Sequence, residues 1–426
     1  MGKHSRKDIK NSKDNDDHFN KNENLSSEKY NLISIIFFIP AFIIILLSIV
    51  SIIFPALIIS RIGVSDFLEP FEIGILGIPL IVINVIIISI VILHFKNLLP
   101  QIFESTIQKI LSFDLSQKNS LIFLIIILGI YIAVSVNELS IYEAEQYGDY
   151  FVMEKAIDLW PNTDTQDNKY LTEQLSRHVR MALLVVSDEI FDNVKVIPFL
   201  ASIFLLITTY FLSIKFSKKN ITGLISVILV LQSSTFLIYD TIAVYENFWA
   251  LFYVFSIYLI LKNSNISAPF YLLSIFSKAI TVLMFPISII ISLLSDISRK
   301  RKLISISMHS AVLIISLTIF QYSDTIYSNV ININSAEFWT GFTTLAFNLR
   351  FDIVLLLFLL PVTIGLFLKA KNGCRNSISL IVLICGTILV TPVLEMLTDF
   401  YFVYPYRYIP LIVFFAVGAS SLFSKK

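Results

Sequence analysis

Long apolar runs recur along the whole chain, and they restrict its fold more than any other feature. Runs of about 18 or more apolar residues are typical of membrane-crossing helices, because lipid offers no hydrogen-bond partner to the backbone. Charged residues make up only 15% of the 426 residues, against roughly 25% in soluble domains. We therefore predict an all-α polytopic membrane protein. The clear runs are Leu32–Ile59, Ile73–Phe95, Leu121–Val136, Val194–Ile214, Ile221–Tyr239, Phe248–Leu261, Leu303–Phe320, Ile353–Leu368, Ile378–Leu394 and Tyr408–Phe423.

The chain divides into three parts by composition. Residues 1–31 mix Lys, Arg, Asp and Asn, which predicts a disordered cytoplasmic tail and not a cleaved signal peptide. Residues 32–119 are expected to hold two extra N-terminal spans and a cytoplasmic linker, and residues 120–426 the main membrane module. The net charge of +1 argues against a nucleic-acid partner, and the two cysteines, Cys374 and Cys385, provide neither a disulfide framework nor a metal site.

The basic residues predict which ends of the spans face the cytoplasm. They fall on one side only if the long run Ala268–Leu294 goes out and returns as two short helices, with Lys278 near their turn. We thus expect about twelve membrane segments in a plasma-membrane protein, with both termini in the cytoplasm and residues 137–193 outside. The basic clusters are Lys215, Lys218 and Lys219; Arg299, Lys300, Arg301 and Lys302; Lys369, Lys371 and Arg375; and Lys425 and Lys426.

The segment 137–193 is a large acidic outer loop in this topology, and it opens with carboxylates. Its apolar residues recur at helical spacing over Tyr142–Trp160, which predicts an interfacial amphipathic helix. A second helix is expected over Tyr170–Phe191. The acidic residues near the loop start are Glu138, Glu143, Glu145 and Asp149.

Four local sequences lie in this order on the predicted outer side: Glu143-Ala-Glu145-Gln-Tyr147-Gly-Asp149-Tyr150, Tyr239-Asp240 through Glu246-Asn247, Ser277-Lys278, and Tyr406-Arg407-Tyr408-Ile-Pro410. Together they resemble the GT-C superfamily of integral-membrane glycosyltransferases. This superfamily includes protein O-mannosyltransferases and aminoarabinose transferases. The resemblance covers roughly residues 120–423, and it departs from the family where Glu-Ala-Glu replaces the usual Asp-containing signature.

The resemblance implies transfer of a sugar from a polyprenyl-phosphate donor to a protein, lipid or glycan acceptor at the outer membrane face. A carboxylate would take the acceptor's proton, and that base would be Glu143 or Glu145. Asp240 and Glu246 would be supporting acids. Two acidic clusters that meet in one cavity could also bind Mg²⁺ or Mn²⁺ through oxygen ligands. The expected substrate-binding residues are Glu138, Tyr147, Asp149, Lys278 and Arg407, the last two contacting the lipid phosphate.

Plainer interpretations stay open for these residues. The loop carboxylates could be solvated charges at a helix start, and Lys278 and Arg407 could extend to the lipid headgroups. Arg177, His178 and Arg180 favour a solvated or headgroup-binding face. Two other functions also remain: a secondary transporter or flippase of lipid-linked substrates, and a non-catalytic GT-C relative.

Overall fold

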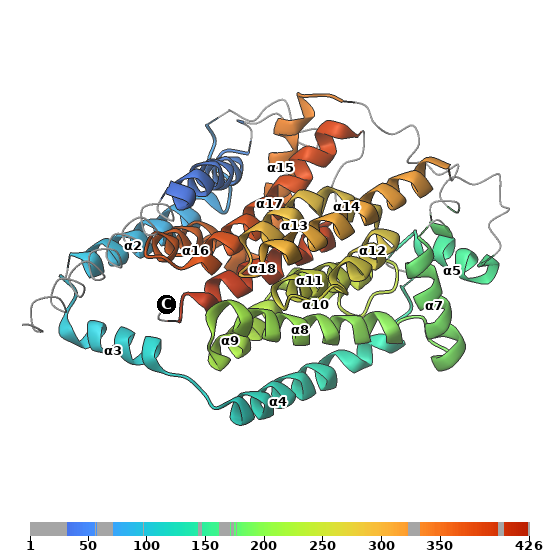
Figure 1. The fold of residues 1–426 in the computed structure, drawn as a ribbon, viewed down its shortest axis with the longest axis horizontal. Helices are drawn as coiled ribbons and strands as arrows, with labels where there is room; N and C mark the ends of the chain where they lie inside the picture. The colour runs from blue at the N-terminus through green and yellow to red at the C-terminus, as the bar shows by residue number, and fades with distance from the viewer. Residues whose placement is uncertain are drawn as a thin grey trace, which may run out of the picture.

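The computed structural model describes residues 32–55, 57, 71–96, 98–143, 147–161, 171, 174–175, 177–322, 333–398 and 404–424. The regular structure of these ranges consists of helices, without strands, as the sequence predicts (Figure 1). The expected tail at residues 1–31 lies outside them. After a first helix, Leu32–Ile53, the elements are α2 (Gly77–Phe95), α3 (Gln101–Ser112), α4 (Gln117–Ser135), η1 (Val136–Ser140), α5 (Tyr150–Leu159), α7 (His178–Phe191), α8 (Val196–Ser217), α9 (Asn220–Leu231), α10 (Ser234–Tyr239), α11 (Phe248–Leu261), α12 (Ser267–Ser277), η3 (Ala279–Met284), α13 (Phe285–Leu294), α14 (Arg299–Tyr322), α15 (Glu337–Leu349), α16 (Ile353–Lys371), α17 (Arg375–Leu397), η5 (Pro405–Tyr408) and α18 (Ile409–Ser421).

Seven of the described helices are long and apolar enough to cross a membrane, so the chain is a helical membrane protein. Other apolar runs are divided into shorter helices. The run Ile221–Tyr239, for example, is interrupted before α10, where the Ser233 hydroxyl accepts a hydrogen bond from the Phe236 N–H. The expectation of about twelve membrane segments therefore stays a prediction. The seven helices are Leu32–Ile53, Gly77–His94, Gln117–Ser140, Val196–Ser217, Arg299–Gln321, Ile353–Lys371 and Arg375–Leu397.

The most buried helices surround α18. Residues 409–417 of α18 are all buried, as expected for a helix that is apolar on every side. Helices α8, α9 and α17 pack directly against it. Peripheral α14 instead exposes Leu303, Ile314 and Leu317 along its length, an apolar surface suited to lipid.

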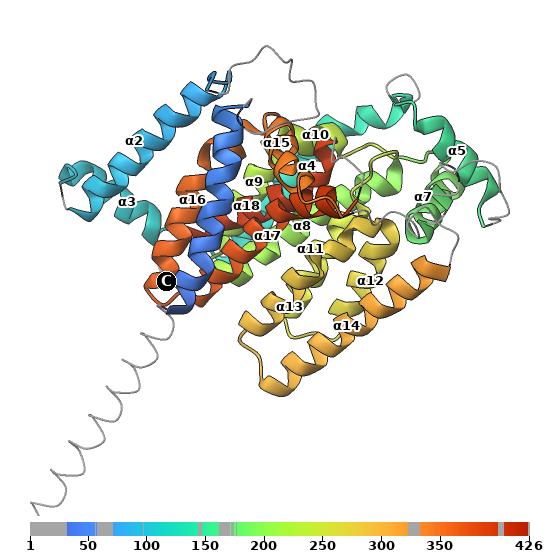
Figure 2. The same cartoon turned by 90° about the horizontal axis from the view of Figure 1, so that it is seen from above.

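The two N-terminal helices dock on α16, at the edge of the bundle (Figure 2). The Phe38 and Phe367 rings stack with their centroids 3.8 Å apart. From α2, the Asn84 amide donates to the Leu357 carbonyl oxygen at 3.3 Å. These helices thus form a layer beside the central helices, and they add Ala41, Ile45 and Leu80 to the main apolar core.

The predicted break at Lys278 is present. Residue Lys278 has an extended backbone (φ −156°, ψ 115°), and it separates α12 from η3 and α13. The predicted loop helix Tyr142–Trp160 is wrong at its start, since α5 begins only at Tyr150; Gly148 just before it disfavours a helix. The second loop helix, α7, begins at His178, after a segment only partly described.

Helices α5 and α7 share a small second apolar cluster, while Tyr150, Met153 and Leu184 of the same helices belong to the main core. That cluster contains Ala156, Leu171, Leu175 and Met181.

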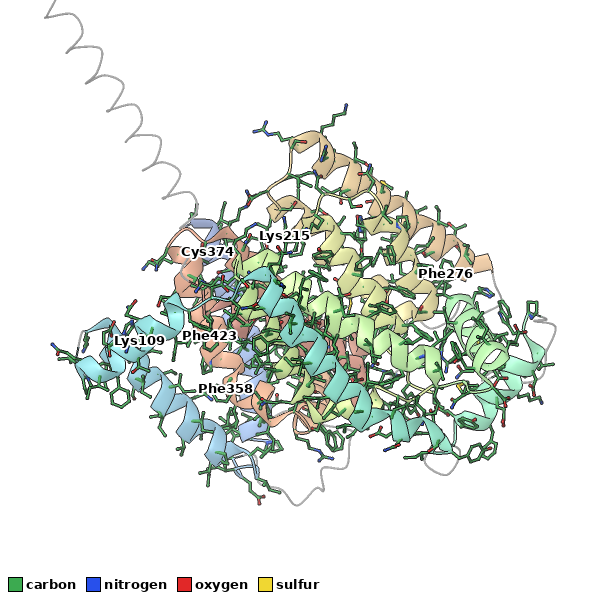
Figure 3. The ribbon with its side chains drawn as sticks, turned by 90° about the horizontal axis from the view of Figure 1, so that it is seen from below. Lys109, Lys215, Phe276, Phe358, Cys374 and Phe423 are labelled. Atoms are coloured by element: carbon green, nitrogen blue, oxygen red, sulfur yellow. The ribbon has the colours of Figure 1, made fainter. Side chains whose placement is uncertain are left out.

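Contacts between distant segments bring the described basic clusters to one end of the bundle, which we call the basic end. Arg375 forms an ion pair of 3.0 Å with Asp296, next to the Arg299–Lys302 cluster. The neighbouring Asn376 donates to the carbonyl of Phe216, at the end of α8. Figure 3 shows Lys215 and Cys374 at this end. Phe276, near the C-terminal end of α12, lies far from both.

Candidate functional site

Residues 240–247 join α10 to α11 and form the centre of a buried polar network at the other end of α8 from the basic end. All eight residues are buried. The Ser202 hydroxyl, near the start of α8, donates to the Asp240 carbonyl oxygen at 2.7 Å. The Asn247 amide in turn donates to the Ser202 hydroxyl oxygen at 2.9 Å. The Ser202 side chain of α8 therefore links the two ends of this segment, Asp240 and Asn247, independently of the large loop.

Glu143 holds the middle of this segment from one side. Its two carboxylate oxygens accept the backbone N–H groups of Ala243 (2.7 Å) and Val244 (3.1 Å), and its side chain is only 2% exposed. Burial raises the pKa of Glu143, and the two N–H donors and nearby Lys195 oppose that rise. Both oxygens are thus committed to the backbone.

Arg180 holds the same two residues from the other side. Its guanidinium donates to the carbonyl oxygens of Ala243 (3.2 Å) and Val244 (3.1 Å) and forms an ion pair of 2.7 Å with Glu246. Arg180 is 0% exposed, so the expectation of a solvated face is wrong for this residue. The signal was its spacing: Arg180, Leu184 and Ser187 recur at helical steps and share the buried face of α7.

Asp240 keeps one carboxylate oxygen without a hydrogen bond. Its Oδ2 accepts the Tyr131 hydroxyl at 2.6 Å and the Ser135 hydroxyl at 3.2 Å, both from α4, whereas Oδ1 is buried and has no partner among the described residues. Burial raises the pKa of Asp240 to about 7, which is the value suited to a proton acceptor near neutral pH.

Lys195, which the sequence did not single out, stands between the first acids of the loop. Its ammonium group donates to the carbonyl oxygens of Glu138 (2.5 Å) and Ile141 (3.2 Å) and lies 3.8 Å from a carboxylate oxygen of Glu143. Burial lowers the pKa of Lys195, while the surrounding carboxylates oppose the change. Glu138 itself accepts the Thr241 hydroxyl at 3.0 Å, so it too contacts the 240–247 segment.

A group of tyrosines connects this network to the end of the chain. The Tyr245 ring stacks on Tyr406, with centroids 4.8 Å apart, and on Tyr404 at 5.1 Å. Tyr147 meets the Tyr245 ring edge-on at 5.2 Å, and the Tyr245 hydroxyl donates to Asp149 at 3.1 Å. Both Tyr147 and Asp149, predicted to bind substrate, therefore lie against the 240–247 segment.

Three cations act on Tyr406. The Lys278 ammonium donates to the Tyr406 hydroxyl and lies 3.9 Å from its ring centroid, and the Arg407 guanidinium lies 5.8 Å from that centroid. Burial alone would raise the pKa of Tyr406, but Lys278, Arg407 and Arg177 outweigh it and lower the pKa to about 8. No carboxylate of the described residues lies within ion-pair distance of Lys278. We call Arg177, Lys278 and Arg407 the cation cluster.

The fold thus gathers almost all of the predicted site residues at one end of the bundle, from four separate segments. Glu145 lies in 144–146, outside the described residues. Within the described ranges no group of three or more His, Cys, Asp or Glu residues is placed to hold a metal ion. Instead, N–H and O–H donors occupy most of the carboxylate oxygens. The gathered residues are Glu138, Glu143, Tyr147, Asp149, Asp240, Glu246, Lys278 and Arg407.

Comparison with protein-family models, with curated proteins and with solved structures finds no match. Fold and site together define a helical membrane protein with a buried polar network at one end.

Proposed function

We propose that the protein is an integral-membrane glycosyltransferase that moves a sugar from a polyprenyl-phosphate donor to an acceptor at the outer face of the plasma membrane. One observation carries the proposal: a cation cluster and a carboxylate with an unused oxygen occur at the same end of the bundle. Tyr239 and Tyr406 connect the two groups, since their rings lie 5.5 Å apart and Tyr239 precedes Asp240. A donor phosphate needs cationic partners, and a reacting acceptor hydroxyl needs a carboxylate to take its proton. The two groups must therefore lie near each other.

The cation cluster is the proposed site for the donor phosphate. A buried charge is costly unless it is paired, and among the described residues the Lys278 ammonium has only the Tyr406 hydroxyl as a hydrogen-bond partner. An anion placed against Lys278 would supply a countercharge to it, and the nearby Arg407 guanidinium is suited to phosphate oxygens. The apolar surfaces of neighbouring helices would take the donor's lipid tail.

Asp240 is the carboxylate that we propose as the base, in preference to Glu143. A base must have a free lone pair directed at the proton that it takes. Both oxygens of Glu143 already accept backbone N–H groups, whereas Oδ1 of Asp240 has no hydrogen-bond partner in the described part of the chain. Glu143 and Glu246 then act as positioning residues for the 240–247 segment. Glu145 stays a further candidate for the base.

The proposed orientation follows from the charges of the two ends. The basic end would face the cytoplasm, as the positive-inside rule predicts, and the 240–247 segment and the large loop would face outside. The chain would then cross the membrane several times, with both termini in the cytoplasm.

The test is label transfer from radiolabelled polyprenyl-phosphate sugars to native membrane extract, with purified protein in lipid. Wild type would be compared with Asp240→Asn, Glu143→Gln and Lys278→Met, and with Asp158→Asn, an exposed acid on α5, as the matched control. We expect Asp240→Asn to lose at least about a hundredfold in rate and Asp158→Asn to keep it. Equal transfer by wild type and folded Asp240→Asn would contradict the role of Asp240. No transfer from any donor, in extract that supports another transferase, would contradict the function.

A transporter or flippase of lipid-linked substrates is the second candidate. The observation that favours it is the break at Lys278, because interrupted helices with charged residues are common at transporter binding sites. Movement of a labelled lipid-linked sugar across vesicles that contain the protein, without transfer of the sugar, would support this candidate.

A further inference from the structure

The connection between α2 and α4, expected to be a plain cytoplasmic linker, contains an amphipathic helix at the basic end. Apolar side chains occupy one half of α3, and Ile102 (78%), Phe103 (62%) and Ile110 (49%) are among the exposed ones. No residue of α3 is buried. A helix of this kind is stable when its apolar face meets the border of a membrane.

Hydrogen bonds hold the C-terminal end of α3 in place although the helix buries nothing. The Lys219 ammonium donates to the carbonyl oxygens of Leu111 (2.6 Å), in the last turn of α3, and of Phe113 (3.2 Å), directly after the helix. In return, Asp114 accepts the backbone N–H groups of Asn220 (3.0 Å) and Ile221 (3.1 Å), the first residues of α9. Each helix thus caps the end of the other.

The other end of α3 is held against α2, where the His94 ring and the Glu104 carboxylate lie 2.9 Å apart. The helix is therefore fixed at both ends.

A groove lies between this fixed helix and α9, next to the end of α18. Its volume is about 380 Å³, within the range of pockets that hold small ligands. Figure 3 shows Lys109 and Phe423 on the same side of the molecule. Lys109 is the only charged residue of the lining; the other lining residues are Ile110, Phe113, Ile221, Ile225 and Phe423.

We propose that this groove binds one anionic phospholipid of the bilayer, with an acyl chain against the apolar lining and the phosphate against Lys109. Charge favours this occupant: exposed Lys218 and half-buried Lys219 lie nearby in the same basic end. The acidic side chains of this region are already engaged, Glu104 by His94 and Asp114 by the start of α9. Lysines at a membrane surface attract anionic lipid by about 1 kcal/mol each, which is about fivefold in affinity.

The test is binding of phosphatidylglycerol and of phosphatidylcholine to the full-length protein, measured by native mass spectrometry after detergent extraction. We expect wild type to retain phosphatidylglycerol in preference to phosphatidylcholine. Lys109→Gln should reduce phosphatidylglycerol retention about fivefold. Ile225→Trp, which would fill the groove, should reduce retention of both lipids. The matched control is Lys300→Gln, since Lys300 is exposed at the basic end on α14 and does not line the groove.

Two results would overturn the proposal. Equal losses from Lys109→Gln and Lys300→Gln would mean that the lipid follows overall charge and not this groove. Retention that Ile225→Trp leaves unchanged, with the variant's thermal unfolding intact, would mean that the acyl chain lies elsewhere. Sugar transfer is not part of this test, so its outcome is independent of the proposed function.

Discussion

The dipeptide Ala243–Val244 is held on both sides by buried charges. Glu143 accepts its two N–H groups, and Arg180 donates to its two carbonyl oxygens. Hydrogen bonds to charged groups contribute roughly 1.5–3 kcal/mol each, more than neutral ones. Glu143 and helix α7, which carries Arg180, are therefore both anchored to the 240–247 segment.

We expect Arg180→Met to destabilise the protein by about 3–5 kcal/mol, because it leaves the Glu246 carboxylate buried without its cation. The double variant Arg180→Met with Glu246→Gln should be more stable than Arg180→Met alone. Thermal unfolding in detergent measures both. His178→Ala, an exposed change at the start of α7, is the control and should fall within about 0.5 kcal/mol of wild type. A double variant less stable than the single one would refute the coupling.

Asp240 predicts a specific dependence of stability on pH. Its pKa is about 7 in the folded protein and 3.8 as the unfolded reference, so the folded state binds the proton more tightly. The stabilisation is complete below pH 3.8, falls as pH rises, and is lost above about pH 7. Between pH 5 and pH 8 this amounts to about 2–3 kcal/mol.

The Asp240→Asn variant should lack this dependence, since its amide does not titrate. We expect the unfolding temperature of wild type to fall more than that of Asp240→Asn between pH 5 and pH 8. If Asp240 is the base, the wild-type transfer rate should rise over the same interval as the carboxylate ionises. Parallel pH curves for the two proteins would show that Asp240 does not titrate in this range.

At the scale of elements, small residues let helices of the bundle approach closely. Gly341 of α15 faces Pro392 of α17, and a Cβ atom at Gly341 would lie 2.5 Å from the Pro392 Cα atom. Backbone cannot move aside as a flexible side chain can, so α15 and α17 pack at this distance only with glycine here. The same α17 carries Glu395, whose carboxylate accepts the Thr344 hydroxyl of α15 at 3.3 Å.

Gly341→Ala should therefore destabilise the protein by about 1–3 kcal/mol through overpacking. Gly129→Ala is the matched control, because nothing lies within 4 Å of a Cβ atom at Gly129 in α4. With no contact from the described residues at that position, the higher helix propensity of alanine should leave stability unchanged or slightly raised. Thermal unfolding of the two variants compares them directly, and equal unfolding temperatures would contradict the close packing of α15 on α17.

At the scale of the whole molecule, the two ends of the bundle differ in charge and in chemistry. The basic end contains Lys215–Lys219, Arg299–Lys302 and Lys369–Arg375, joined by the contacts of Asn376 and Arg375. The other end contains the 240–247 segment and the cation cluster. A bilayer with a membrane potential and anionic inner lipids favours one orientation of such a molecule.

Native Cys374, which is partly exposed at the basic end, tests that orientation. We expect a membrane-impermeant maleimide to label Cys374 in opened vesicles but not in intact cells. The variant Asp158→Cys in a Cys374→Ser background should be labelled in intact cells, because α5 belongs to the loop predicted outside. Buried Cys385 should not react in either case. Labelling of Cys374 in intact cells would invert the proposed topology.

Much of the element pattern could be predicted from the sequence because it depends on local signals. Apolar runs, basic flanks and the charge at Lys278 predicted the helical membrane fold and the interruption between α12 and α13. Helix starts were less predictable: α5 begins at Tyr150, eight residues later than expected from Tyr142, because Gly148 disfavours a helix, and Glu143 is bonded to the 240–247 segment.

The sequence by itself determined that the chain is helical and apolar and that its acids and basic residues occur in separate groups. Only the tertiary structure decided the roles within the site. Glu143 and Asp240 are both carboxylates at predicted loop positions, yet one has both oxygens on backbone N–H groups and the other keeps one free. Hydrogen-bond partners come from segments about a hundred residues apart, so no local pattern specifies them. Arg180 and Lys195 likewise belong to the site through hydrogen-bond partners that are distant from them in the sequence.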